Sequence, residues 1–206
     1  NKFKKVHLKA PGTDLEVELP QGHIWVGGGQ TSTEGVYFLP NLPTEEVFSL
    51  PKKTGVNGTL RSTKPLNYRS NLIDNFELIF KDGRIVDFSA EVEYDTLKNL
   101  IDTDEGSHYL GEIALVPHNS PISNTNIIFY NTLFDENASC HFAIGAAYSL
   151  CIEDGPTMSK EEKERVGVND SLTHVDFMVG CSEMDIVGIK EDGSKVQVFK
   201  DGNWAF

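Results

Sequence analysis

Polar and apolar side chains alternate near the start of the chain. Residues 6–9 read V-H-L-K and residues 15–19 read L-E-V-E-L, so every second position is apolar. A repeat of two places alternate side chains on opposite faces of a β-strand. The pattern therefore predicts a strand or a hairpin over residues 6–19.

Asp-Gly pairs between apolar segments predict further antiparallel hairpins. Residues 76–80 and 85–88 flank the pair at 82–83, and Asp-Gly favours a tight hairpin turn. Two more pairs lie near the end of the chain, at 192–193 and 201–202, again beside apolar segments. We expect a meander over these last residues.

Helices are fewer than strands. Residues 93–101 are one candidate, and residues 138–151 carry small and apolar side chains at helical spacing, with Asn137 as a possible N-cap. Ser159 and Glu162 match a capping box that opens a short charged helix. The pattern predicts the α+β class, mainly antiparallel β with a few helices.

Composition narrows the class of protein. The 206 residues are 39% hydrophobic and 24% charged, which is ordinary for a globular chain, and we expect a single domain over residues 1–206. A net charge of −13 argues against a nucleic-acid partner, because phosphates would be repelled. The sequence holds no run of about 18 apolar residues, so we expect no membrane-spanning helix.

The cysteines and the first residue bear on location and completeness. Cys140, Cys151 and Cys181 are odd in number and form no C-x-x-C motif, which argues against a disulfide framework or a cysteine zinc site. Reduced thiols fit a cytoplasmic location. The chain begins with Asn1 and no signal peptide precedes it, so we interpret it as a piece of a longer protein.

Six acidic and imidazole side chains form the candidate site. The clearest pair is His174 and Asp176, which an apolar, strand-like segment would project from the same face. A carboxylate buried there needs a partner or a metal, although a simple His–Asp hydrogen bond would also satisfy it. The full set is Glu46, Glu112, Glu136, His141, His174 and Asp176.

Glu136 lies between a β-like apolar stretch, residues 127–134, and the predicted helix. A helix N-terminus there would favour its negative charge. His141 is five residues further on, about 140° around a helix, so the two converge only if Glu136 precedes that helix. The alternative is a carboxylate at a helix terminus and a packed histidine.

Three further positions complete the candidates. Glu112 precedes a probable buried strand, residues 113–116, and Glu46 lies where a Pro-containing loop enters a strand. Glu45 is its neighbour, and one of the two is expected to face solvent. Tyr148 is seven residues after His141 and would share its face of the predicted helix, where a core tyrosine is the alternative.

Three Glu, one Asp and two His make a mixed oxygen and nitrogen ligand set. The set is too rich in carboxylates for one structural zinc ion. It suits two divalent ions bridged by a carboxylate, with positions open for water and substrate. Zinc, cobalt and manganese all accept such ligands.

Several segments resemble the aminopeptidase T / aminopeptidase S (PepS) family of cytosolic dinuclear metallo-aminopeptidases. They are N-L-P-T-E-E-V-F (41–48), H-Y-L-G-E-I-A-L-V-P (108–117), F-Y-N-T-L-F-D-E-N-A-S-C-H (129–141), H-V-D-F-M-V-G (174–180) and the terminal N-W-A-F. They follow the family's order over nearly the whole chain. The resemblance implies release of N-terminal amino acids from peptides by two divalent metals.

The resemblance also implies residue roles and partners. The metal ligands would be Glu46, Glu112, Glu136, His141, His174 and Asp176, with Tyr148 as a catalytic tyrosine. Glu112 is our candidate for the bridging carboxylate, and Glu136 or Glu46 for the general base. Family members are homodimers about twice this length, so this chain corresponds to their C-terminal, metal-binding half.

Two alternatives stay open. Another two-metal hydrolase, such as a phosphoesterase, would use similar ligands. The glycines at 27–29 lack the Lys-Ser/Thr of a phosphate-binding loop, so they indicate a strand turn or bulge instead. The second alternative is a catalytically silent fragment or assembly domain, whose acids would be salt-bridge partners.

Overall fold

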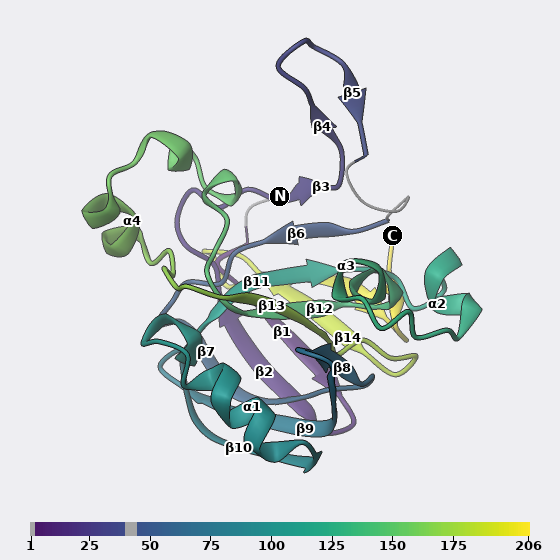
Figure 1. Ribbon diagram of the computed structural model, residues 1–206. Coiled ribbons are helices and arrows are strands. Elements are labelled where there is room, and N and C mark those ends of the chain that lie inside the picture. Colours follow the sequence, from purple (N-terminus) through teal and green to yellow (C-terminus); the bar gives the residue numbers. More distant parts are fainter. Residues whose placement is uncertain (1–2, 40–44) are drawn as a thin grey trace.

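The computed structural model describes residues 3–39 and 45–206. Two antiparallel sheets pack face to face, with short helices at their margins (Figure 1). Antiparallel pairing joins every strand pair in these described ranges. This confirms the predicted class, a mainly antiparallel β fold with few helices.

The larger sheet has nine strands within the described ranges. Its order is β10-β9-β7-β2-β1-β14-β15-β16, and β8 pairs with β9. The bounds are β1 Lys5–Ala10, β2 Thr13–Glu18, β7 Val56–Arg61, β8 Leu66–Tyr68, β9 Asn71–Lys81, β10 Arg84–Val92, β14 Asp185–Ile189, β15 Lys195–Lys200 and β16 Asn203–Trp204.

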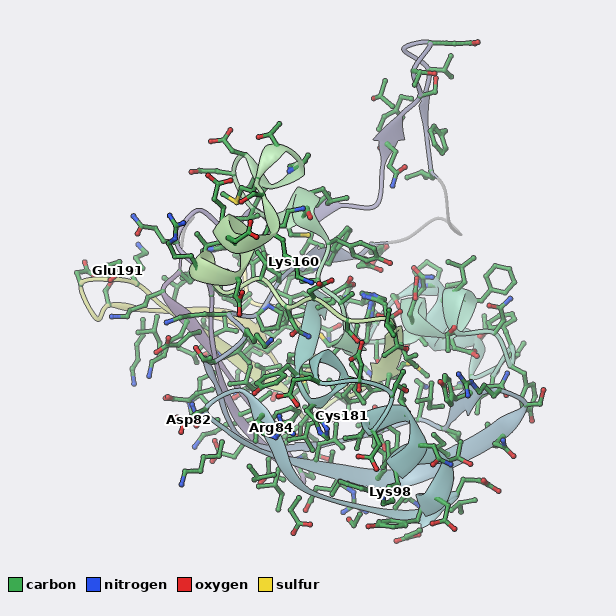
Figure 2. The ribbon with its side chains drawn as sticks, turned by 60° about the vertical axis from the view of Figure 1, so that its left-hand side comes forward. Asp82, Arg84, Lys98, Lys160, Cys181 and Glu191 are labelled. Carbon is green, nitrogen blue, oxygen red and sulfur yellow. The ribbon has the colours of Figure 1, made fainter. Side chains whose placement is uncertain are left out.

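The smaller sheet has five strands in the described part, in the order β13-β12-β11-β6-β3. Its bounds are β3 Val26–Gly27, β6 Val47–Ser49, β11 Leu110–Leu115, β12 His141–Gly145 and β13 His174–Met178. A separate hairpin pairs β4 Gln30–Thr31 with β5 Tyr37–Phe38, and both figures show it standing away from the two sheets (Figures 1 and 2).

Helices are short in the described ranges. The α-helices are α1 Tyr94–Ile101, α2 Pro121–Thr125, α3 Thr132–Asp135 and α4 Lys160–Val166. The 3₁₀ turns are η1 Gly106–His108, η2 Glu136–Ala138, η3 Ser149–Cys151 and η4 Gly155–Thr157. No helix among the described residues combines the length and apolar character that crossing a membrane requires.

The local sequence signals explain most of these elements. The alternation at 6–19 becomes the β1–β2 hairpin, in which Leu8 lies opposite Leu15 and both are buried. The turn between β9 and β10 has φ of 49° at Asp82 and 82° at Gly83, as an Asp-Gly hairpin turn requires. Ser159 caps α4 in the predicted capping box. The predicted helix at 93–101 and the final meander are also confirmed.

The predicted helix at residues 138–151 is wrong. Residues 141–145 form β12, a central strand of the smaller sheet, and all five of its residues are buried. A strand covered on both faces is apolar at every position, so its pattern cannot be told from that of a buried helix. Asn137 consequently caps no helix and donates from Nδ2 to the Leu133 carbonyl instead.

The predicted β-like stretch at residues 127–134 is also wrong. Asn131 accepts a hydrogen bond from the Leu133 amide and opens the short helix α3. Ile127 and Tyr130 are exposed, at 56% and 63%, so their apolar character does not mark a buried strand. Glu136 therefore follows a helix, at the start of η2, and does not precede one.

One continuous apolar core lies between the two sheets. Phe76 on β9 of the larger sheet meets Phe177 on β13 of the smaller sheet, with ring centroids 5.3 Å apart. Both side chains are fully buried and belong to the main hydrophobic cluster. The core thus fixes the inner face of β13, the strand that also carries His174 and Asp176.

Truncating the core at this contact should destabilise the fold. Phe177→Ala is expected to lower the free energy of unfolding by about 3–5 kcal/mol, because it removes buried surface and leaves a cavity. Phe206→Ala is the matched control, since Phe206 is 88% exposed. Urea denaturation with EDTA present measures both, and a loss below about 1 kcal/mol for Phe177→Ala would contradict the proposed core contact.

Candidate metal centre

Three adjacent strands bring most of the candidate residues to one face. In the register, Ala143 on β12 lies opposite Glu112 on one side and Asp176 on the other. His141 and His174 lie two residues along the same faces of β12 and β13. Ala114, Ala143 and Gly145 occupy the intervening positions of this face, and their small side chains leave room for carboxylates and imidazoles.

A β-bulge sets the direction of Glu112. The pairing of β11 with β12 shifts register between Leu110 and Glu112. A side chain on the intervening Gly111 would lie 2.1 Å from the carbonyl oxygen of Ala146, so the close approach requires glycine. Glu112 therefore lies within β11, where sequence reasoning placed it just before the strand.

The ligand atoms fall into two groups that share Glu112. Glu46, Glu112 and His141 form one group, and Glu112, His174 and Asp176 form the other, with the ligand atoms of each group within 4.8 Å of one another. Glu112 Oε1 is 3.6 Å from His141 Nε2, and Glu112 Oε2 is 3.5 Å from His174 Nε2. The two oxygens of one carboxylate thus face different histidines.

Each group has a further carboxylate on its histidine. Glu46 Oε2 lies 3.8 Å from His141 Nε2, and Asp176 Oδ1 lies 3.4 Å from His174 Nε2. The buried Asp176 Oδ1 makes no well-formed hydrogen bond among the described residues. A buried carboxylate oxygen in this state is suited to a cation.

Backbone carbonyls orient both imidazole rings. His141 Nδ1 lies 3.0 Å from the Ser139 carbonyl oxygen, and His174 Nδ1 lies 2.7 Å from that of Ala146. A carbonyl only accepts, so Nδ1 donates in both rings and Nε2 faces the carboxylates. Metal-binding histidines are typically fixed in this way through their other nitrogen.

The carboxylates strongly perturb the histidines. Burial acts to lower the pKa of His141, but hydrogen bonding to Glu112 and the charge of Glu46 outweigh burial and raise the pKa to about 10. Burial likewise opposes protonation of His174, and Asp176 raises its pKa to about 9. Without metal, the imidazolium forms compensate part of the negative charge.

Glu136 contacts the site through Asp176. Burial and the charge of Asp176 raise the pKa of Glu136 to about 8, while burial also raises that of Glu46. Burial opposes ionisation of Asp176, but the nearby His174 imidazole and the Glu136 carboxyl help to lower its pKa. Without metal, Glu136 is therefore protonated at neutral pH and donates a hydrogen bond to Asp176.

Tyr148 reaches the site from a different element than predicted. It follows β12 in an extended conformation, so the expected helical spacing from His141 does not apply. Its ring lies 4.5 Å from that of His174 and 6.4 Å from that of Phe48. Burial and the charge of Asp176 raise the pKa of Tyr148 to about 12, which keeps the phenol protonated as a hydrogen-bond donor.

An open cleft of about 820 Å³ is lined by Glu46, Glu112, Glu136, Tyr148, His174 and Asp176. Its described lining contains acids and apolar side chains but no Lys or Arg. The apolar wall is formed by Val26, Phe48, Leu133, Tyr148 and Leu150. Sequence reasoning missed Leu133 and Leu150, since an exposed apolar residue in a cleft has the same local signature as a core residue.

The donor set fits divalent ions. Four carboxylates and two oriented imidazoles converge without a neighbouring lysine or arginine in the described lining. Carboxylate oxygens and imidazole nitrogens of this kind are ligands that divalent metal ions accept. Comparison with known proteins agrees with this chemistry: residues 1–204 match the family model described as "Thermophilic metalloprotease (M29)".

The chain belongs to the M29 metalloprotease family.

Relatives within the M29 family carry aminopeptidase names. The chain is 60% identical over 204 residues to "Aminopeptidase 2" of Geobacillus stearothermophilus and 57% identical to "Aminopeptidase AmpS" of Bacillus subtilis (strain 168), covering 99% of this chain in both. It covers 49% and 50% of those two proteins. The chain thus spans about half the length of the curated relatives it matches.

A solved M29 structure shares the fold. The structure "Wild-type AmpT from Thermus thermophilus" superposes with a TM-score of 0.92 at 43% identity, covering 99% of this chain and 50% of that one. The resemblance to the aminopeptidase T and S family is confirmed. Family membership implies a divalent metal, which the donor set described above fits.

The metal-free protein should lose stability as the pH rises. The pKa values of Glu136, His141 and His174 are about 8, 10 and 9, all raised above their ordinary values. The folded chain therefore binds more protons than the unfolded chain, and this stabilisation disappears as the pH rises through the folded pKa values. We expect the free energy of unfolding in EDTA, measured with urea, to fall between about pH 6 and 9.

Glu136→Gln separates one contribution to this decline. The substitution removes the group with the lowest of the three raised pKa values, so the fall in stability between about pH 6 and 8 should become shallower. Stability that stays constant or increases with pH in the unsubstituted protein would contradict the ionisation states assigned above.

Proposed function

We propose that this protein is a metallo-aminopeptidase that releases N-terminal amino acids from peptides at a centre of two divalent ions. The observation that carries the proposal is Glu112, whose two oxygens each face a different histidine at 3.5–3.6 Å. The aminopeptidase names of the M29 relatives support the reaction. Zinc, cobalt and manganese are the candidate ions.

The ligand roles follow the two groups. Glu46 and His141 would hold one ion, His174 and Asp176 the other, and Glu112 would bridge them. Glu136 lies outside both groups and contacts Asp176, so we assign it to the general-base role ahead of a ligand role. Glu46, the other candidate base, is better placed as a ligand because it faces His141.

The reaction would be addition of water to the scissile carbonyl. Divalent ions held by these ligands supply activation of water and polarisation of the carbonyl. The positive charge of bound ions would favour the ionised form of Glu136, which would accept a proton from the attacking water and deliver it to the leaving amine as the C–N bond breaks. Tyr148 donates a hydrogen bond to the oxyanion that develops on the carbonyl oxygen.

The lining of the cleft favours peptides over phosphate esters. A phosphoesterase would gain from cationic side chains around the phosphate, and the described lining contains no Lys or Arg. The apolar wall suits peptide side chains. Assays of aminoacyl amides beside phosphate esters distinguish the two reactions, and a catalytically silent assembly domain would hydrolyse neither.

We also propose a cytoplasmic location and a homodimeric assembly. The described thiols are free, with Cys140 and Cys151 buried, which supports a reducing, cytoplasmic compartment. A homodimer is proposed from the family resemblance alone. We propose no nucleic-acid or membrane partner, in keeping with the charge of −13.

Glu112→Gln tests the bridging role. The amide would weaken both ligand groups at once. We expect the metal content to fall well below the two ions per chain of the unsubstituted protein, and kcat/KM to fall at least about a hundredfold. Elemental analysis after dialysis and an aminoacyl-amide assay measure these in the protein at the full length its gene encodes. Glu45→Gln is the matched control, because Glu45 is exposed beside Glu46. Full metal-dependent activity in Glu112→Gln would refute the assignment.

Tyr148→Phe tests the oxyanion donor. Removing the hydroxyl should lower kcat about ten- to a thousandfold and leave KM and metal content nearly unchanged, because the phenol acts only on the developing charge. Phe48→Leu serves as a control for packing against the Tyr148 ring. An unchanged kcat in Tyr148→Phe would return Tyr148 to a packing role.

A further inference from the structure

A carboxylate outside the cleft binds the segment that leads into β13. Asp104 lies between α1 and η1, and its Oδ2 accepts a hydrogen bond of 2.6 Å from the Leu172 amide. Its Oδ1 accepts from the Ser171 hydroxyl at 2.8 Å and from the Ser107 amide at 2.8 Å. Asp104 thereby joins two loops that are 68 residues apart in sequence.

Hydrogen bonds, and not apolar packing, hold this segment. Leu172 is 87% exposed, so its side chain gives the segment no anchor in the core. Leu172 is also two residues from His174, the first residue of β13. The start of β13 is therefore held by its pairing with β12 and, just before it, by the polar contacts of residues 171–173.

The same segment is connected to the His174 ring through Ala146. The Ala146 amide donates to the Thr173 carbonyl at 2.7 Å, and the Ala146 carbonyl accepts from His174 Nδ1 at 2.7 Å. Buried Asn169 donates from Nδ2 to the carbonyls of Gly106 and Gly145. Asp104 thus belongs to a hydrogen-bond network that runs through residues 171–173 to Ala146, whose carbonyl holds the His174 ring.

The other ligand group has different supports. His141 is oriented by the Ser139 carbonyl, and Glu46 directly precedes β6. The hydrogen bond that orients His141 therefore involves neither Asp104 nor residues 171–173. A substitution at Asp104 would therefore affect the Glu112–His174–Asp176 group more than the Glu46–Glu112–His141 group.

We propose that Asp104 is a positioning residue for the Glu112–His174–Asp176 ion site and not for the Glu46–Glu112–His141 site. The inference rests on the two-ion centre proposed above. It predicts that loss of the Asp104 contacts weakens binding of one ion selectively, because His174 loses its fixed orientation while His141 keeps its own. Outer contacts of metal ligands typically change affinity about 10–100-fold.

Calorimetric titration of the metal-free, full-length protein with Zn²⁺ tests the proposal. Asp104→Asn should weaken one of two binding events about tenfold or more and leave the other within about twofold. Asp102→Asn is the matched control, because Asp102 lies two residues before Asp104 and forms a surface ion pair with Lys98 of α1. Lys98 is labelled in Figure 2. The control variant should change neither event.

Ser171→Ala keeps the test valid if Asp104→Asn fails to fold. It removes one donor to Asp104 and should weaken the same event by a smaller factor. Equal weakening of both events, or two unchanged events in both variants, would overturn the positioning role. Fewer than two binding events in the unsubstituted protein would instead refute the two-ion centre itself.

Discussion

The arrangement of the cleft depends on burying one carboxylate inside the protein. Glu112 is 5% exposed, and it lies in a strand whose six residues are all buried. An ionised carboxylate is costly to bury unless positive charge lies beside it. The two histidines, on β12 and β13, lie beside it, and the cations that the donor set fits would add positive charge there.

The backbone is organised around the same requirement. The bulge at Gly111 directs Glu112 toward both histidines, and the alanines at 114 and 143 leave space in front of it. The outer face of the sheet carries polar ligands, while Phe177 on the inner face packs into the core. One sheet therefore supports the apolar interior on one side and the charged centre on the other.

Sequence predicted the parts of the fold that local signals determine. Alternation, Asp-Gly turns and the capping box at Ser159 each act within a few residues, and each corresponds to an observed element. The strand at 141–145 was missed because the partners that pair with its two edges, β11 and β13, lie far away in sequence. Local pattern carries no information about such neighbours.

The candidate site shows the same division. His174 and Asp176 were predicted on one strand face from spacing alone, and they lie 3.4 Å apart. Glu136 and Tyr148 lie at the cleft as well, but η2 and the turn after β12 bring them there, and the helix expected from spacing does not exist. The support from Asp104 has no sequence signal, because its partners follow 67 and 68 residues later.

The distribution of the ligands along the chain has a consequence for synthesis. The first candidate ligand is residue 46 and the last is residue 176, and they come together through the pairing of β6, β11, β12 and β13. During synthesis, the group of Glu46, Glu112 and His141 has all its members once residue 141 has been made, whereas the group of Glu112, His174 and Asp176 also needs residue 176 of the 206. The two groups would therefore become complete at different stages of synthesis, and the group that contains His174 and Asp176 would be the later one.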